Sequence, residues 1–244
     1  MGRFPAAQKT REIRERGRKY MRTKIQNKTA SAEIESLGAQ LMSLKNAEGT
    51  EYLWQGNPAF WSSRAPVLFP TVGNVRGGTT IINGKPYALK RHGFARNLEH
   101  SVLDSGANFI AYSLKDSEET RKLYPFVFEL RVTYRLIENG LTTEFAVFNR
   151  GDEELPFGIG GHPGFRCPLV PGERFEDYTV RFSQPEEMTQ LVMDLSGKTP
   201  YENKAVSLQE IPCDYALFAQ YSTLIYRGMK SSFVTLEGKA HHGV

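Results

Sequence analysis

Apolar and polar side chains alternate with a period of two along much of the chain after Met21. The clearest alternation lies in residues 126–148. Its first half places five apolar residues on one face, namely Phe128, Leu130, Val132, Tyr134 and Leu136. The residues between them are polar, namely Glu129, Arg131, Thr133 and Arg135. Successive side chains of a β-strand point to opposite faces of a sheet, so this pattern predicts a strand with one buried face.

Asn-Gly pairs mark two predicted β-hairpins. Glu138, Asn139 and Gly140 end the first run, and the alternation restarts at Leu141. A second hairpin is predicted over Thr80–Leu89, where the turn falls at residues 83–84. Asn and Gly both tolerate positive φ, which the tight turns of hairpins require.

Shorter alternating or apolar runs predict further strands, and no segment after residue 20 has the pattern of an amphipathic helix. These strands are predicted over Ala30–Ser36, Gln40–Lys45, Asn108–Leu114, Tyr178–Phe182, Leu191–Asp194 and Ser232–Leu236. Many short strands separated by Gly, Pro and Asn turns are typical of an all-β protein. We therefore expect one domain over residues 21–244, folded as a large antiparallel β-sandwich.

The charge of the chain is concentrated at its start. The 244 residues carry 31 basic and 27 acidic side chains, a net charge of +4. Residues 1–20 hold seven of the basic and two of the acidic residues, so the remainder has a net charge of −1. A basic arm can bind nucleic acid or an anionic membrane. The favoured interpretation is a basic extension that is disordered or weakly helical, in a protein that binds neither nucleic acid nor membrane.

Cysteine content and hydropathy indicate the cellular compartment in which the protein is expected. Cys167 and Cys213 are the only cysteines, too few for a disulfide framework or a thiolate zinc site. We expect them to be free thiols in a reducing compartment, and we predict no metal site. The start of the chain is charged, unlike a secretory signal, and no apolar run has the length of a membrane span. These features predict a cytoplasmic protein.

Two histidines lie beside glycines, where a ligand can approach the backbone closely. His92 precedes Gly93, and His162 follows Gly161. Imidazole can donate or accept a proton near neutral pH, but each ring could equally be structural. Arg64 heads an apolar run and either lies at a rim or binds an oxygen-rich ligand. His100 is expected at the surface. The chain has no Walker loop, GxGxxG, HExxH or GxSxG motif, which argues against nucleotide-dependent enzymes and common serine hydrolases.

Three motifs occur in an order that resembles a known family. They are Arg-Ala-Pro-Val-Leu-Phe-Pro at residues 64–70, Arg-His-Gly-Phe-Ala-Arg at 91–96, and Gly-Gly-His-Pro-Gly-Phe-Arg-Cys-Pro-Leu at 160–169. Trp-Gln-Gly-Asn-Pro at 54–58, Trp61 and Asp-Tyr-Ala-Leu-Phe at 214–218 accompany them. Together they resemble the galactose mutarotase-like superfamily, and most closely the aldose 1-epimerases of the LacX type. The resemblance implies a large antiparallel β-sandwich, in agreement with the alternation.

The resemblance also implies a reaction and a set of site residues. The reaction interconverts the α and β anomers of a free aldose such as glucose or galactose, with no cofactor. His162 would be the acid at the ring oxygen, and His92 would assist by hydrogen bonding near the same atom. Further residues would contact the sugar: Arg64, Arg96 and Asp214 through its hydroxyl groups, and Phe165 and Trp61 through apolar ring faces.

One departure from the family pattern concerns the base. The family's base is a glutamate in a C-terminal motif like Ile-Glu-Pro-Trp, and this chain has no Glu-Pro-Trp. We therefore expect the chain to lack the final strands of the sandwich and the usual base. Glu237 is the nearest substitute, but its position matches a strand that precedes the base, so a structural role is favoured for it.

Three other functions remain open at this point. The first is a hexose-6-phosphate 1-epimerase, in which Arg64, Arg91 and Arg96 would bind the phosphate. The second is a sugar-binding protein without catalytic activity. The third is a nucleic-acid binder that acts through residues 1–20.

Overall fold

The computed structural model describes residues 10–15, 18–192, 202–221, 223–240 and 243–244. The chain divides into two compact units, residues 1–165 and 166–244, and each is described by itself. Most of the described residues in both units are in antiparallel strands, so the predicted all-β class is confirmed. The prediction of a single domain over residues 21–244 stays a prediction. Among the described helices, none combines the length and the apolar character that crossing a membrane requires.

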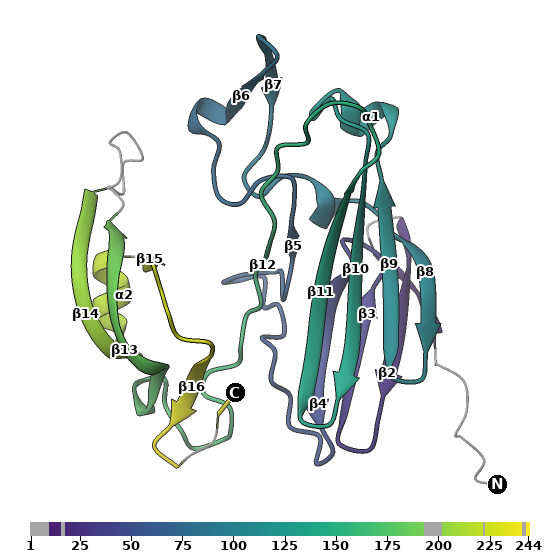
Figure 1. Ribbon diagram of the computed structural model, residues 1–244. Helices are drawn as coiled ribbons and strands as arrows, with labels where there is room; N and C mark the ends of the chain where they lie inside the picture. The colour runs from purple at the N-terminus through teal and green to yellow at the C-terminus, as the bar shows by residue number, and fades with distance from the viewer. Residues whose placement is uncertain (1–9, 16–17, 193–201, 222, 241–242) are drawn as a thin grey trace, which may run out of the picture. The chain divides into compact units, whose positions relative to one another are not determined.

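The first unit contains two four-stranded antiparallel sheets (Figure 1). One sheet has the order β1-β2-β3-β4, with bounds Thr10–Glu15, Arg18–Gln26, Ala30–Glu35 and Gln40–Asn46. The other has the order β11-β10-β9-β8, with bounds Gly140–Asn149, Phe128–Ile137, Phe109–Lys115 and Ser101–Gly106. Apolar side chains of both sheets share one core, which includes Ile25 and Ile34 from the first and Leu130 and Val132 from the second.

The register of β10 and β11 confirms the predicted hairpin. Leu136 pairs with Leu141 and Ile137 pairs with Gly140, so the turn consists of Glu138 and Asn139. The five apolar residues of the predicted face, from Phe128 to Leu136, are all buried. Burial of one face thus fixes the register, because a slip by one residue would turn this face to solvent.

Smaller elements complete the first unit. The hairpin of β6 (Thr79–Ile82) and β7 (Lys85–Ala88) turns at residues 83–84, which have φ of +50° and +74°, as predicted. The remaining elements are β5 (Val67–Leu68), β12 (Gly160–Gly161), the α-helical turn α1 (Glu118–Arg121) and the 3₁₀ turns Arg76–Gly78 and Ala95–Asn97. β5 pairs with β12, and this pairing supports the candidate site.

The second unit is built on the long strand β13 (Tyr178–Val192). β13 pairs with β14 (Glu202–Pro212), β15 (Ile225–Arg227) and β16 (Val234–Gly238). The 3₁₀ turn Phe175–Asp177 precedes β13, and helix α2 (Tyr215–Tyr221) follows β14. A small core is formed by Phe182, Met188 and Ile211. Both strands predicted near residues 178–194 begin within β13, although residues 193 and 194 lie outside the described part.

The structure departs from the sequence-based expectations at three places. Within residues 1–20, expected to be disordered or weakly helical, the described residues 10–15 and 18–20 are strand, because the edge of β2 offers unpaired backbone groups to β1. α2 was not expected, since its seven residues are too few to show a helical period. His100 was expected at the surface but is 1% exposed, because its backbone and ring both bond to carbonyl groups of neighbouring segments.

Candidate functional site

The segment that carries His162 is fixed by main-chain hydrogen bonds on both sides. β12 pairs with β5, so Gly161 lies opposite Val67. Beyond this pair, the His162 amide donates to the Pro66 carbonyl at 3.1 Å, and the Gly164 amide donates to the Arg64 carbonyl at 2.7 Å. The two motifs, separated by almost a hundred residues in sequence, are therefore aligned residue by residue.

The loop that carries His92 is held by a close backbone approach at Gly93. Gly93 forms a parallel bridge with Phe69, and the amides of Phe94 and Ala95 both donate to the Phe69 carbonyl. A Cβ atom at Gly93 would lie 2.1 Å from that carbonyl oxygen, and Gly93 has φ of +67°. His92 itself has φ of +67°, a conformation that non-glycine residues rarely adopt. The backbone is thus arranged to direct the imidazole of His92.

The two histidines lie beside each other. The centroids of the His92 and His162 rings are 5.8 Å apart, and the His162 ring is 5.2 Å from that of Trp61. Gly164 makes room for this indole, because a Cβ atom there would lie 2.6 Å from Trp61 Cζ3. His162 is exposed and His92 is partly buried, so the pair is open to a ligand.

Hydrogen bonding and charge both favour the neutral form of the His92 ring. The Gly73 amide donates to His92 Nδ1 at 3.0 Å, while the His92 amide donates to the Gly73 carbonyl at 2.8 Å. Arg91 Nε also donates toward Nε2, at 3.1 Å, but a neutral ring carries a proton on one nitrogen and can accept only at the other. The neutral ring that accepts from the main chain of Gly73 therefore carries its proton on Nε2 only when the exposed Arg91 side chain turns away. Burial lowers the pKa of His92, and the positive charges of Arg91 and Arg96 and the neighbouring His162 lower it further.

Two arginines border the histidines or their loops. The guanidinium of Arg64 donates from Nη1 to the Met42 carbonyl and from Nη2 to the Gln55 carbonyl, both at 3.1 Å, which fixes its plane. Arg96 Nη2 donates to the Arg91 carbonyl at 3.1 Å. Arg96 Nε is buried and, among the described residues, has no hydrogen-bond partner. A buried donor of this kind is costly unless a ligand or water accepts from it.

The remaining predicted site residues lie elsewhere or carry other contacts. Phe165 is 42% exposed and bridges to Leu53, next to the Trp54–Gly164 hydrogen bond. Asp214 belongs to residues 166–244, where its Oδ1 accepts from the Ala216 amide at 2.7 Å and so caps α2. Glu237 lies in β16 opposite Thr179 in the same unit. The geometry brings together His92 and His162, and places Asp214 and Glu237 in the other unit.

Two supporting residues had no functional signal in the sequence. Gly73 fixes the ring of His92 from 19 residues away. Gln40 accepts through Oε1 from the amides of Arg64 and Ala65, at 2.9 and 3.2 Å, and so fixes the backbone at the head of the apolar run. Such contacts depend on the fold and have no local sequence pattern.

Comparisons with known proteins match this chain over most of its length. The family model described as aldose 1-epimerase matches residues 21–194. The chain is 36% identical to "Protein LacX, chromosomal" of Lactococcus lactis over 232 residues, 90% of this chain and 76% of that protein. A galactose mutarotase related enzyme from Lactobacillus acidophilus has a structure with a TM-score of 0.84 and 35% identity, covering 90% of this chain and 74% of that chain.

A more distant match bears on phosphorylated substrates. It is the "Putative glucose-6-phosphate 1-epimerase" of Escherichia coli (strain K12), 29% identical over 126 residues. The match covers 48% of this chain and 39% of that protein.

Proposed function

The chain belongs to the aldose 1-epimerase family, and from this premise we propose that it interconverts the α and β anomers of a free aldose. The observation that carries the proposal is the pair of imidazoles, 5.8 Å apart, beside the indole of Trp61. Anomer exchange requires proton transfer at the ring oxygen and at the C1 hydroxyl, and histidine can transfer protons near neutral pH.

In the proposed mechanism the histidines act at the ring oxygen. His162 donates a proton to this oxygen as its bond to C1 breaks, while a base takes the proton of the C1 hydroxyl. The open-chain aldehyde rotates about the C1–C2 bond and closes on its other face, and both protons return. Water or a carboxylate accepts the hydroxyl proton. A structural role in β16 is favoured for Glu237, and its role as this carboxylate is the lesser alternative.

His92 is proposed as a hydrogen-bond donor that remains neutral. Its Nδ1 accepts from the fixed main chain of Gly73, so its Nε2–H is the group that can reach a ligand oxygen. The side chain of Arg91 lies 3.1 Å from Nε2 and is exposed, so a sugar oxygen can replace it there. The lowered pKa of His92 favours the neutral form of this ring.

The remaining roles concern sugar binding. We propose that Arg64 and Arg96 donate to hydroxyl groups and that Asp214 accepts from one. Trp61 and Phe165 would contact the apolar face of the sugar ring, since aromatic faces pack against C–H groups. The two carbonyls that hold Arg64 support this assignment, because a guanidinium already fixed in its plane loses little entropy on binding.

The test is anomer exchange measured by NMR on the purified chain with glucose and with galactose. We expect His162→Ala to reduce the exchange rate about 10²-fold or more, the usual contribution of a general acid or base. His92→Gln should retain more activity than His92→Ala, because an amide can still donate a hydrogen bond. Glu119→Ala, in the exposed turn α1, serves as the matched control. Undiminished exchange in His162→Ala would overturn the assignment.

The variant Glu237→Gln tests whether Glu237 or another group accepts the proton of the C1 hydroxyl. Loss of exchange with unchanged sugar binding would assign the base to Glu237, whereas unchanged exchange would assign it to water or another carboxylate. Ligand-induced shifts without exchange above background in the unmodified chain would instead indicate a sugar-binding protein.

A second candidate is a hexose-6-phosphate 1-epimerase. It is supported by the buried Nε of Arg96 without a partner in the described part, and by the arginines whose charge lowers the pKa of His92. Guanidinium groups suit phosphate oxygens. Glucose 6-phosphate should then be exchanged at much lower concentration than glucose, and Arg96→Ala should remove this difference. Equal concentration dependence for the two sugars would exclude this candidate.

A further inference from the structure

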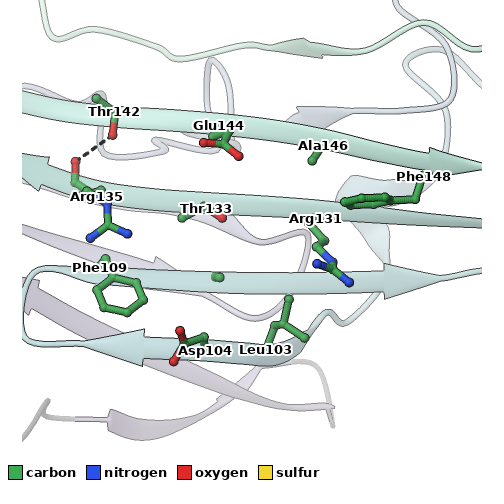
Figure 2. A pocket seen from close by; sticks show the side chains of 11 residues that line it. Leu103, Asp104, Phe109, Arg131, Thr133, Arg135, Thr142, Glu144, Ala146 and Phe148 are labelled. Atoms are coloured by element: carbon green, nitrogen blue, oxygen red, sulfur yellow. Dashed lines mark hydrogen bonds between the residues drawn. The ribbon is translucent and has the colours of Figure 1, made fainter.

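A hollow on the solvent-facing side of the sheet β11-β10-β9-β8 shares no residue with the histidine site (Figure 2). Its volume is about 350 Å³, within the ~300–1,000 Å³ range of small-molecule pockets. The opposite side of the same sheet carries the core, including Leu130, Val132 and Tyr134. The hollow therefore lies on the outer surface of the sheet, away from the apolar core.

The strand register explains why this surface is hollow and charged. Asp104 pairs with Ala111, Ala111 with Thr133, and Thr133 with Glu144, so these four residues form one row across the sheet. The small side chains of Ala111 and Thr133 leave the middle low, and a carboxylate lies at each end. Arg131 and Arg135 flank Thr133 along β10, and their Cα atoms are about 14 Å apart, since each of the four residue steps advances a strand by about 3.4 Å. The floor is thus bordered by two cations along the strand and two anions across it.

The two arginines are held in place by aromatic and ionic contacts. Arg131 Cζ lies 4.5 Å from the centroid of the Phe148 ring, and Arg135 Cζ lies 4.5 Å from that of Phe109. Arg131 Nε also donates to Glu129 at 2.6 Å. A fixed guanidinium binds a ligand with less loss of entropy than a mobile one. These stacks are visible at the two ends of the hollow, where each arginine is drawn near its phenylalanine (Figure 2).

Glu129 holds the arginine side chains at one end of the hollow. It is only 3% exposed although it lies on the outer side of the sheet. It accepts from Arg131, from Arg150 Nη2 at 2.7 Å and from Ser113 Oγ at 3.1 Å. The hydrogen bonds from the two arginines lower the pKa of Glu129 to about 2, so it stays charged. This end of the hollow is consequently preorganised before any ligand binds.

We infer that this hollow binds a neutral saccharide of one or two rings. The arginines at 131, 135 and 150 are balanced by the carboxylates at 104, 129 and 144, so the site offers no net charge to an anion. Guanidinium groups only donate hydrogen bonds and carboxylates only accept them, and sugar hydroxyls do both. The exposed Leu103 adds apolar surface for the C–H face of a sugar ring, while the faces of Phe109 and Phe148 hold the arginines. This inference does not depend on the proposed epimerase activity.

The test uses the full chain and sugars that have no anomeric hydroxyl to exchange. Methyl β-D-galactopyranoside and sucrose are titrated while the backbone amide shifts of Ala111, Thr133 and Glu144 are followed by NMR. We expect saturable shifts with a dissociation constant in the millimolar range, because the site is shallow. Arg135→Ala and Glu144→Ala should each weaken binding about tenfold or more, since hydrogen bonds to charged groups are lost.

Matched variants and competing ligands make the outcome decisive. His162→Ala should leave these shifts unchanged, and Arg135→Ala should leave anomer exchange unchanged, which separates this site from the histidine site. Arg135 and Glu144 are solvent-facing, and unchanged melting temperatures of their variants would show that the fold is kept. Three results would overturn the inference: no shifts of these amides, shifts unaffected by either variant, or tighter binding of inorganic phosphate or glycine than of both sugars.

Discussion

The position of His92 depends on Gly93, because only a residue without a Cβ atom fits next to the Phe69 carbonyl. At Gly93 the backbone of one motif passes so close to the Phe69 carbonyl that a methyl group would overlap the oxygen. At Gly164 a methyl group would displace the indole of Trp61 from the ring of His162. The glycines of these motifs therefore position the histidines, and conformational freedom is only part of their role.

Gly93→Ala should destabilise the protein by about 3 kcal/mol or more, because it adds a steric overlap to an unfavourable positive φ. Gly84→Ala is the matched control. Gly84 also has positive φ, +74°, but a Cβ atom there would have no atom within 4 Å, so only the backbone cost of about 1–2 kcal/mol applies. The measurement is urea denaturation of both variants. Equal losses of unfolding free energy would show that the close approach to Phe69 is unimportant.

Individual strands and turns differ in how far the sequence predicts them. The β10–β11 and β6–β7 hairpins carry both an alternating pattern and an Asn-Gly pair, and both were predicted at the correct place. Only β6–β7 turns at its Asn-Gly pair with positive φ, whereas β10–β11 turns at Glu138 and Asn139. β1, β5 and β12 are edge or two-residue strands whose pairing depends on distant partners. α2 is short and begins at a capping aspartate, Asp214, which resemblance alone had marked as a sugar ligand. Local pattern specifies regular elements, whereas tertiary contacts specify the others.

The residues of the candidate site likewise differ in how far the sequence predicts them. The motifs around His92 and His162 indicated both histidines, and the structure brings the two rings together. Their roles in catalysis stay predictions. Gly73 and Gln40, which fix the His92 ring and the Arg64 backbone, could not be predicted because each contact joins residues 19 or more positions apart.

Strand β1 should be dispensable for the fold, whereas β2 should not. β1 is the edge of its sheet, and its Arg11–Glu33 ion pair is exposed and worth at most ~1 kcal/mol. Deletion of residues 2–15 should therefore preserve cooperative unfolding with a small loss of stability. β2 pairs on both sides and buries Thr23 and Ile25, so deletion of residues 2–26 should cost several kcal/mol or prevent folding.

The two deletions are compared by circular dichroism during thermal unfolding. The shorter deletion stops before Arg18 because β2 begins there and Tyr20 is buried. Loss of the cooperative transition in the shorter deletion would show that β1 contributes more than an edge strand.

At the scale of the whole molecule, His100 and Glu129 have large pKa shifts and should dominate how stability depends on pH, while the lowered pKa values of Glu186 and Asp177 add to the acid step. His100 lies in the core region, with Nδ1 bonded to the Leu98 carbonyl and Nε2 without a partner in the described part. Burial lowers its pKa from 6.5 to about 4. Glu129, held by Arg131 and Arg150, has a pKa lowered from 4.5 to about 2. Each group binds protons less readily in the folded protein than in the unfolded chain.

Stability should consequently fall in two adjoining steps as the pH is lowered. Between pH 6.5 and about 4 the unfolded chain protonates His100 first, which removes about 3 kcal/mol of unfolding free energy. Between pH 4.5 and about 2 the unfolded chain protonates Glu129 first, and its stabilisation is lost in turn. Urea denaturation at intervals from pH 7 to about pH 2 measures both steps.

Substitutions assign each step to its group. Replacing a titrating group changes the slope of the unfolding free energy against pH, even if it also changes stability at neutral pH. His100→Asn removes the titrating ring, so the curve should lose most of its slope between pH 6.5 and 4.5, where the lowered pKa of His92 still contributes. Glu129→Gln should lower stability at pH 7, since Arg131 and Arg150 lose their partner, and should flatten the lower step. A wild-type curve already flat above pH 4.5 would mean that water reaches His100 and that the core does not exclude its charge.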